Sequence, residues 1–189
     1  MQLFCTLKKK GETPLANHFF QATADFSPAH TLYPGQWLQS QQASVALLQQ
    51  PSPHNIQLIC EPKTPASFTL QLEGSPLPPP TAPTLLIAKA LPGLGGLLFA
   101  AQAWKTLDIP LFALLQLDPP FPFQSTPSRI WLPGAPQGAI ATLPLLEDWG
   151  IPTRLMGDFP GGFEGSLSEW LTHWHQHHPQ TCQVITFNL

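Results

Sequence analysis

Charge is the scarcest feature of this sequence. Asp, Glu, Lys and Arg together make up only 10% of its residues, against about 25% in an average soluble protein. The formal net charge is -3. The one basic cluster, Lys8 to Lys10, is expected at a solvated hairpin tip. Because a nucleic-acid surface needs clustered Lys and Arg, the sequence argues against nucleic acid as a partner.

Cysteine is also sparse. The sequence has three cysteines, Cys5, Cys60 and Cys182, which lie far apart and form no C-x-x-C motif. An odd number at such spacing disfavours a disulfide framework or a zinc site, and it suits a protein of a reducing compartment. The N-terminus has no apolar run typical of a signal peptide. We therefore expect a cytoplasmic protein.

Long uninterrupted apolar runs are missing. The longest apolar segment, residues 85–103, is broken by Lys89, Pro92 and three glycines. A membrane-spanning helix needs about 20 consecutive apolar residues. No membrane association is expected.

Proline, in contrast, is abundant, with 24 residues, and it divides the chain. Residues 76–83 hold five prolines, a composition that favours an extended linker. Short alternating segments separated by turn residues precede it and indicate a small antiparallel barrel or sandwich. Strand-like and helix-like segments alternate after it, which indicates a mostly parallel sheet. We expect a β domain at 1–75, a linker at 76–83 and a Rossmann-like α/β domain at 84–189, an α+β chain of two parts.

The α/β part is expected to contain three helices. The apolar spacing and the breakers place them at residues 94–105, 139–149 and 163–177. Strands are expected at 85–88, 110–117, 128–132, 151–156 and 183–189. Pro144 lies inside the second helix and is expected to shorten or kink its first turn.

A glycine-rich stretch follows the first of these strands. Gly93, Gly95 and Gly96 form G-x-G-G ahead of the first helix, and Asp118 ends the next strand. In a nucleotide-binding βαβ unit, glycines let the backbone approach a phosphate at a helix N-terminus, and an acid downstream meets the ribose. The alternative is a plain βαβ unit whose glycines serve a tight turn.

These four residues are the candidate cofactor-binding site. A carboxylate at Asp118 would repel a 2′-phosphate, so NAD(H) should bind better than NADP(H). Replacing Gly95 by Val should weaken binding while the fold survives, provided that Gly95 does not need a positive φ.

Three other groups of residues have both a functional and a structural interpretation. His173 and His177 are four residues apart on a helix, a spacing that metal sites use, but a frayed polar helix end explains them, and no metal site is expected. Glu147 and Asp148 are expected to be solvated. The aromatic loop Phe121-Pro122-Phe123 covers a cleft or meets a partner, or else packs in the core.

Three short motifs carry a resemblance to a known family: Pro34-Gly35-Gln36-Trp37-Leu38, residues 85–98, and Gly162-Phe163-Glu164-Gly165. They resemble the ferredoxin–NADP reductase family, especially its branch containing the electron-transfer subunit of dihydroorotate dehydrogenase. The first is similar to a strand of the family's flavin barrel, the second resembles its apolar strand and glycine-rich turn, and the third resembles the turn and helix of that branch. The resemblance implies a reduced flavin barrel, a Rossmann-like sheet, FAD and NAD(P) as cofactors, and a redox protein partner.

The sequence departs from the family at the cofactor motifs. The barrel element Arg-x-Tyr/Phe-Ser should fall within residues 44–53, which read SVALLQQPSP, and no Arg precedes Arg129. The family's C-terminal Cys-Gly-Pro turn is not found. A flavin pyrophosphate would thus lack the guanidinium that binds phosphate oxygens in pairs.

Two function classes follow. One is a ferredoxin reductase-like oxidoreductase that passes electrons to a protein partner. The other is a degenerate, cofactor-free relative that serves as a binding or assembly subunit. An absence of bound flavin is the outcome expected for the purified chain.

Overall fold

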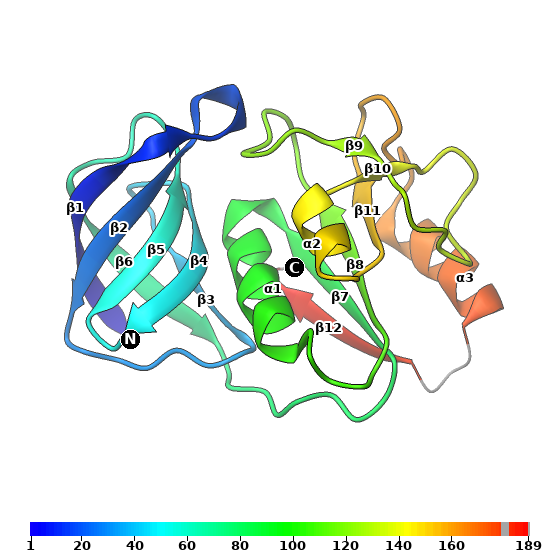
Figure 1. The fold of residues 1–189 in the computed structure, drawn as a ribbon, viewed down its shortest axis with the longest axis horizontal. Coiled ribbons are helices and arrows are strands. Elements are labelled where there is room, and N and C mark those ends of the chain that lie inside the picture. Colours follow the sequence, from blue (N-terminus) through cyan, green and yellow to red (C-terminus); the bar gives the residue numbers. More distant parts are fainter. Residues whose placement is uncertain (179–181, 189) are drawn as a thin grey trace.

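The computed structural model describes residues 1–178 and 182–188. An antiparallel barrel and a helix-flanked parallel sheet lie side by side in Figure 1. An extended segment, residues 75–83, joins them. The expected fold class, a reduced barrel followed by a Rossmann-like sheet, is confirmed.

The barrel has six antiparallel strands in the order β3-β6-β1-β2-β5-β4. Their bounds are β1 Gln2–Pro14, β2 Phe20–Ser27, β3 Gln36–Gln39, β4 Val45–Ser52, β5 Asn55–Cys60 and β6 Ser67–Gly74. A 3-10 turn, η1 Ala16–His18, connects β1 to β2. Alternate residues such as Ala22, Ala24 and Phe26 point inward and fill the core, as the two-residue repeat of a strand requires. Residues 8–10 belong to β1 rather than to a hairpin tip, and their side chains lie outside the described ones.

The second part contains a four-stranded parallel sheet in the order β11-β8-β7-β12. Its strands are β7 Thr84–Lys89, β8 Leu111–Gln116, β11 Thr153–Met156 and β12 Gln183–Phe187. The crossovers carry α1 Ala90–Trp104, α2 Pro144–Asp148 and α3 Leu167–His177, and a small ladder of β9 Thr126–Pro127 and β10 Ala141–Thr142. No helix within the described residues is long and apolar enough to span a bilayer.

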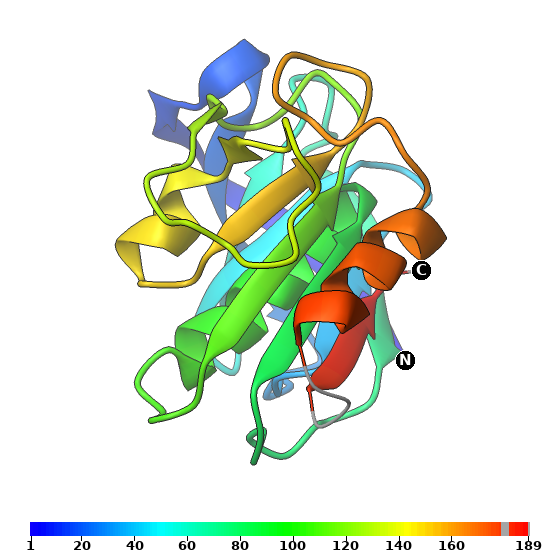
Figure 2. The same ribbon diagram turned by 90° about the vertical axis from the view of Figure 1, so that its right-hand side faces the viewer.

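The two faces of this sheet bury different side chains. Leu86 and Ala88 of β7 pack with α1 and α2, whereas Leu85 and Ile87 pack with Trp170 and Trp174 of α3. Figure 2 shows α3 in front of the sheet and α1 behind it. Because β7 is buried on both faces, it reads as a continuous apolar run, as parallel strands do.

Several helix boundaries differ from those expected. α1 begins at Ala90 rather than at residue 94, because Pro92 lies in its first turn, where proline is tolerated. The expected helix 139–149 is reduced to α2, because Pro144 starts the helix instead of bending it. α3 starts at Leu167, not 163, because Ser166 and Glu169 form a reciprocal capping box. The strand expected at 128–132 is a loop, and residue 189 of the last strand lies outside the described residues.

Helix α1 joins the barrel to the sheet. Phe19, Ala46 and Ile59 from the barrel belong to the same apolar cluster as Leu94, Leu97 and Leu98 of α1 and the sheet residues beneath them. Across the same contact Trp37 meets Phe187 edge to face, with ring centroids 6.3 Å apart. A single apolar core therefore runs from the barrel wall through α1 into the parallel sheet.

Candidate functional site

The glycine-rich stretch lies inside helix α1 and not in a turn before it. Gly93, Gly95 and Gly96 are buried within its first two turns. The expected phosphate-binding amides of residues 93–97 are therefore corrected: with Lys89 as the N-cap, the amides from Gly93 onward lie at positions that bond within the helix. The helical residues before them whose amides have no partner position inside the helix are Ala90 and Leu91, because Pro92 has no N–H.

Each of the three glycines allows a close approach between α1 and another element. A Cβ on Gly93 would lie 2.5 Å from the Phe187 carbonyl oxygen. One on Gly96 would lie 2.9 Å from Cβ of Trp37, and one on Gly95 would overlap the backbone nitrogen of Leu47. The G-x-G-G pattern thus fits α1 against β12, β3 and β4, a close-packing role that glycines also take in dinucleotide folds.

This packing covers the barrel segment that the family resemblance assigns to flavin. At the start of β4, Ala46 is buried in the cluster that contains α1, whereas Val45 and Leu47 are buried inside the barrel. The Gly95 contact shows that the helix backbone meets the strand backbone there. A planar ring inserted between two surfaces needs about 3.5 Å to the atoms on each side. The residues present do not fit an isoalloxazine at this place.

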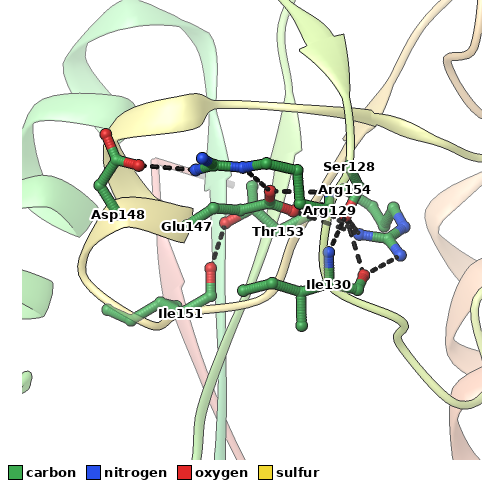
Figure 3. A network of polar contacts seen from close by, with 8 residues as sticks. All are labelled: Ser128, Arg129, Ile130, Glu147, Asp148, Ile151, Thr153 and Arg154. Carbon is green, nitrogen blue, oxygen red and sulfur yellow. Dashed lines mark hydrogen bonds and ion pairs between the residues drawn. The ribbon is translucent and has the colours of Figure 1, made fainter.

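The two arginines of the sequence, Arg129 and Arg154, belong to the network of polar contacts in Figure 3. Arg154 Nη1 donates to Ser128 Oγ at 2.8 Å and to the Thr153 carbonyl oxygen at 2.7 Å, and lies 3.9 Å from Glu147 Oε1. Ser128 Oγ and the Arg129 amide both donate to the Glu147 carboxylate. Burial lowers the pKa of Arg154, and Glu147 partly offsets this. The expectation that Glu147 is solvated was wrong: it is 5% exposed and ties the β9–β10 connection to α2 and β11.

Asp118 and the start of α1 line one pocket. Strands β7 and β8 are parallel, so Ala90 and Asp118, which follow them, meet at the same edge of the sheet. The pocket, here called the carboxyl-edge pocket, has a volume of about 230 Å³. It is lined by Phe19, Ser44, Glu61, Ala90, Leu91, Leu117, Asp118, Pro119, Pro120, Phe121 and Pro122. Open α/β sheets bind ligands at this edge.

The chemistry of this pocket suits a ribose better than a pyrophosphate. Asp118 and Glu61 supply carboxylates that accept hydrogen bonds from hydroxyl groups, and the described residues that line the pocket include no Lys or Arg. Among these residues, a phosphate would meet backbone amides at the start of α1. Of the expected site residues, the structure brings Asp118 to the helix terminus, whereas Gly95 and Gly96 face the barrel and β12 instead. Glu61, contributed by the barrel, was missed, because nothing local in its sequence marks it.

Ala90 stands out in the backbone of this pocket. Its φ is 56°, a left-handed conformation that non-glycine residues seldom adopt. Such conformations persist where the surrounding structure enforces them, and they cluster at binding sites.

A second hollow of about 670 Å³ follows strand β11 at the same edge. It is lined by Gln137, Gly138, Asp158, Phe159, Pro160, Gly161, Gly162, Phe163 and Glu164. It therefore includes part of the Gly-aromatic-x-Gly motif noted in the sequence. Asp158 and Glu164 make its lining acidic.

The aromatic loop packs inward. Phe121 is 8% exposed. It stacks on Phe123 with centroids 5.5 Å apart and meets Phe159 edge to face at 4.8 Å. Of the alternatives left open, the structure favours core packing, with Phe121 also forming part of the wall of the carboxyl-edge pocket.

The histidines at the end of α3 point in different directions. His177 Nδ1 lies 3.1 Å from the His173 carbonyl oxygen, whereas His178 stacks on Trp174 and its Nε2 lies 2.8 Å from the Pro133 carbonyl oxygen. Within the described part of the chain, no group of three or more His, Cys, Asp or Glu side chains is arranged to hold a metal ion. The expectation that His173 and His177 bind no metal stays a prediction.

Neither Cys5 nor Cys182 offers a reactive thiolate. Burial, together with the nearby Cys60, raises the pKa of Cys5 to about 12. Burial also raises the pKa of Cys182. At neutral pH both thiols are protonated, and the thiol is a far poorer nucleophile than the thiolate.

Comparisons with known proteins show similarity in fold and none in sequence. The sequence matches no protein-family model and has no significant match among curated proteins. Solved structures do match. An NADH-dependent reduced ferredoxin-NADP oxidoreductase aligns over 96% of this chain and 68% of its own, at 12% identity and a TM-score of 0.54.

Two further structures align at the same level. A cytochrome P450 reductase of Amycolatopsis aligns over 99% of this chain and 70% of its own, at 11% identity and a TM-score of 0.50. The FAD/NAD-binding domain of a nitric oxide dioxygenase of Vibrio cholerae aligns over 97% and 98%, at 10% identity and 0.50. At such identities the likeness concerns the fold, and this chain has the fold of the ferredoxin–NADP reductase-like flavoproteins.

Proposed function

We propose that this chain is a ferredoxin reductase-like binding or assembly subunit that has lost the flavin site of its fold. The observation that carries the proposal is the contact of α1 with β4. Gly95 lets the helix backbone touch the strand that the family resemblance assigns to flavin, and Ala46 of that strand is buried in the same apolar cluster as α1. The absence of any arginine before Arg129 supports the same conclusion.

The proposal is tested by offering flavin directly. The purified chain is titrated with FAD and with FMN in a calorimeter, and visible absorbance is recorded after removal of excess ligand. We expect no heat beyond dilution and no retained flavin. A stoichiometric band near about 450 nm, the cofactor's own absorption, would contradict the proposal and restore the electron-transfer function in full.

A second candidate is an oxidoreductase module that binds NAD(H) and passes electrons to a protein partner. The carboxyl-edge pocket favours it, since Asp118, the free amides of α1 and the strained Ala90 converge there. The fold neighbours described above include NAD-dependent and FAD/NAD-binding proteins by name. The finer likeness to the dihydroorotate dehydrogenase branch rests on short motifs and stays a prediction.

NAD(H) titration separates the two candidates. If the dinucleotide binds at the carboxyl edge, NAD(H) should bind more tightly than NADP(H), because Asp118 repels a 2′-phosphate. Asp118→Asn should then weaken NAD(H) binding and reduce the preference. The control is Asp108→Asn, an exposed aspartate that lies before β8, at the opposite edge of the sheet. Equal heats of NAD(H) binding for the original chain and both variants would mean that the ligand does not bind in this pocket. If none of the three proteins gives a heat of binding, the function as a binding or assembly subunit is the one supported.

A further inference from the structure

The segment that joins the two parts of the molecule, residues 75–83, reads SPLPPPTAP. It contains no helix or strand and runs along the lower edge of the molecule between β6 and β7 in Figure 1. Proline fixes its own φ at about −65° and drives the residue before it towards an extended ψ. Four of residues 76–80 are proline, so residues 75–80 are expected to form a turn and a half or more of polyproline II helix.

Burial along this segment repeats with the period of a polyproline II helix. Leu77 is partly buried and Pro80 is buried, whereas Pro76, Pro78 and Pro79 are exposed. A polyproline II helix has three residues per turn, so residues 77 and 80 lie along one edge, and this edge faces the protein. The other two edges face outward, with Pro76 and Pro79 along one and Pro78 on the other.

The inner edge of the segment is held by specific contacts. Leu77 carries the one backbone N–H among residues 76–80, and it donates to the Pro34 carbonyl oxygen at 2.8 Å. Its side chain packs against the apolar cluster that contains α1. A Cβ on Gly35 would lie 2.6 Å from Leu77 Cγ, so the segment is pressed against the turn before β3. Because the segment is ordered before any partner arrives, binding to its outer edges costs little conformational entropy.

The outer edges offer proline rings and backbone carbonyl oxygens. Residues 74–83 have no charged side chain, and a polyproline II backbone makes no internal hydrogen bonds, so its carbonyls can accept from a partner. A partner strand would fit poorly, because proline has no N–H to donate to a ladder. A groove lined with aromatic side chains fits well: its rings pack against proline, and Trp N–H or Tyr O–H groups donate to the carbonyls.

We propose that residues 75–80 are a docking surface for a partner protein with an aromatic-lined, polyproline-binding groove. Pro76 and Pro79 enter the groove together, because they are three residues apart and share an edge. The inference goes beyond the binding or assembly function proposed above, because it does not require the loss of a flavin site. None of residues 75–80 lines the carboxyl-edge pocket, so titration with flavin or NAD(H) and the test of docking have separate outcomes.

The test offers the whole chain to domains that bind polyproline II segments. Isotope-labelled WW and SH3 domains are titrated one at a time with the unlabelled chain, and two-dimensional NMR spectra of the labelled domain are recorded. We expect at least one domain to bind, with its shifts concentrated at the aromatic residues of its groove. The double variant Pro76→Ala/Pro79→Ala should bind at least about tenfold more weakly, as expected when the anchor residues of an interface are truncated.

The chain contains a matched control. Pro62 and Pro65 are also exposed and three residues apart, but Pro62 lies in a turn that is closed by a hydrogen bond of 3.0 Å from the Thr64 amide to the Glu61 carbonyl oxygen. The double variant Pro62→Ala/Pro65→Ala should therefore bind like the original chain. Melting temperatures of both double variants separate loss of binding from loss of fold.

A change on the partner's side completes the test without altering this chain. Replacing one aromatic residue of the domain's groove by Ala should abolish binding of the original chain. The proposal is overturned if no domain binds, or if binding survives either Pro76→Ala/Pro79→Ala or the change in the groove. Equal weakening by the two double variants would overturn it as well, because the turn at Pro62 does not present a polyproline II edge.

Discussion

The Glu147 carboxylate holds three segments of the chain together. It accepts from Ser128 and from the Arg129 amide and faces the buried guanidinium of Arg154. Burying two charges is costly, and it is tolerated here because hydrogen bonds satisfy most of their polar atoms. The network fixes the loop before β10 against α2 and β11.

Replacing Glu147 by Gln should be strongly destabilising. The change leaves the Arg154 charge buried without its counter-charge, and breaking a buried pair in this way costs about 3–5 kcal/mol. Urea denaturation of the two proteins measures the difference in the free energy of unfolding. Asp148→Asn is the matched control, because Asp148 is exposed and pairs with the exposed Arg129, so its replacement should cost less than about 1 kcal/mol. Similar costs for the two variants would mean that the buried pair contributes no more than a surface pair.

At the level of elements, α1 decides how the two sheets meet. Its glycine side contacts β3, β4 and β12, while Leu86 and Ala88 of β7 pack in the same apolar cluster as its leucines. A helix with ordinary side chains at residues 93, 95 and 96 would stand farther from the barrel. At this greater distance α1 would no longer cover the face of β4 that it contacts through Gly95.

Gly95→Ala should lower stability, although alanine normally favours a helix. Relative to glycine, alanine gains about 0.5–1 kcal/mol in a helix interior. Here the added Cβ would overlap the Leu47 backbone nitrogen, and overpacking of this kind costs about 1–3 kcal/mol. This replaces the expectation that Gly95→Val would leave the fold intact.

Urea denaturation checks the sign of the Gly95→Ala effect. Ala103→Gly, at an exposed position of the same helix, calibrates the propensity difference without any packing change. A higher free energy of unfolding for Gly95→Ala than for the original chain would mean that a Cβ fits between α1 and β4 without overpacking.

The elements that the sequence predicted well are those set by local patterns. The alternation in β2 and the spacing of Trp170 and Trp174 in α3 identify their buried faces without knowledge of their partners. The start of α1 was not predictable in the same way, because its glycines resemble a turn until Leu47, Trp37 and Phe187 are known to press against them. The burial of Glu147 was not predictable for the same reason, since its partner Arg154 belongs to a different element and the fold brings them together.

At the level of the whole molecule, the barrel and the parallel sheet share the apolar cluster around α1. Ala46 and Ile59 lie in the same cluster as α1 and β7, although a proline-rich segment separates the two parts in sequence. Domains joined by a linker often unfold independently. A shared core argues instead for one cooperative unit.

Replacing Leu47 by Ala tests this cooperativity in the intact chain. Leu47 is fully buried inside the barrel, and its truncation should cost about 2–5 kcal/mol. If the molecule unfolds as one unit, amide hydrogen exchange under native conditions should lose the same protection in β8 of the parallel sheet as in β2 of the barrel. Val184→Ala, at a site that is 41% exposed on β12, should change neither. Loss of protection in β2 with β8 unaffected would instead mean that the contacts of α1 with the barrel are too weak to couple the two parts, and the segment at residues 76–83 would then be a true domain linker.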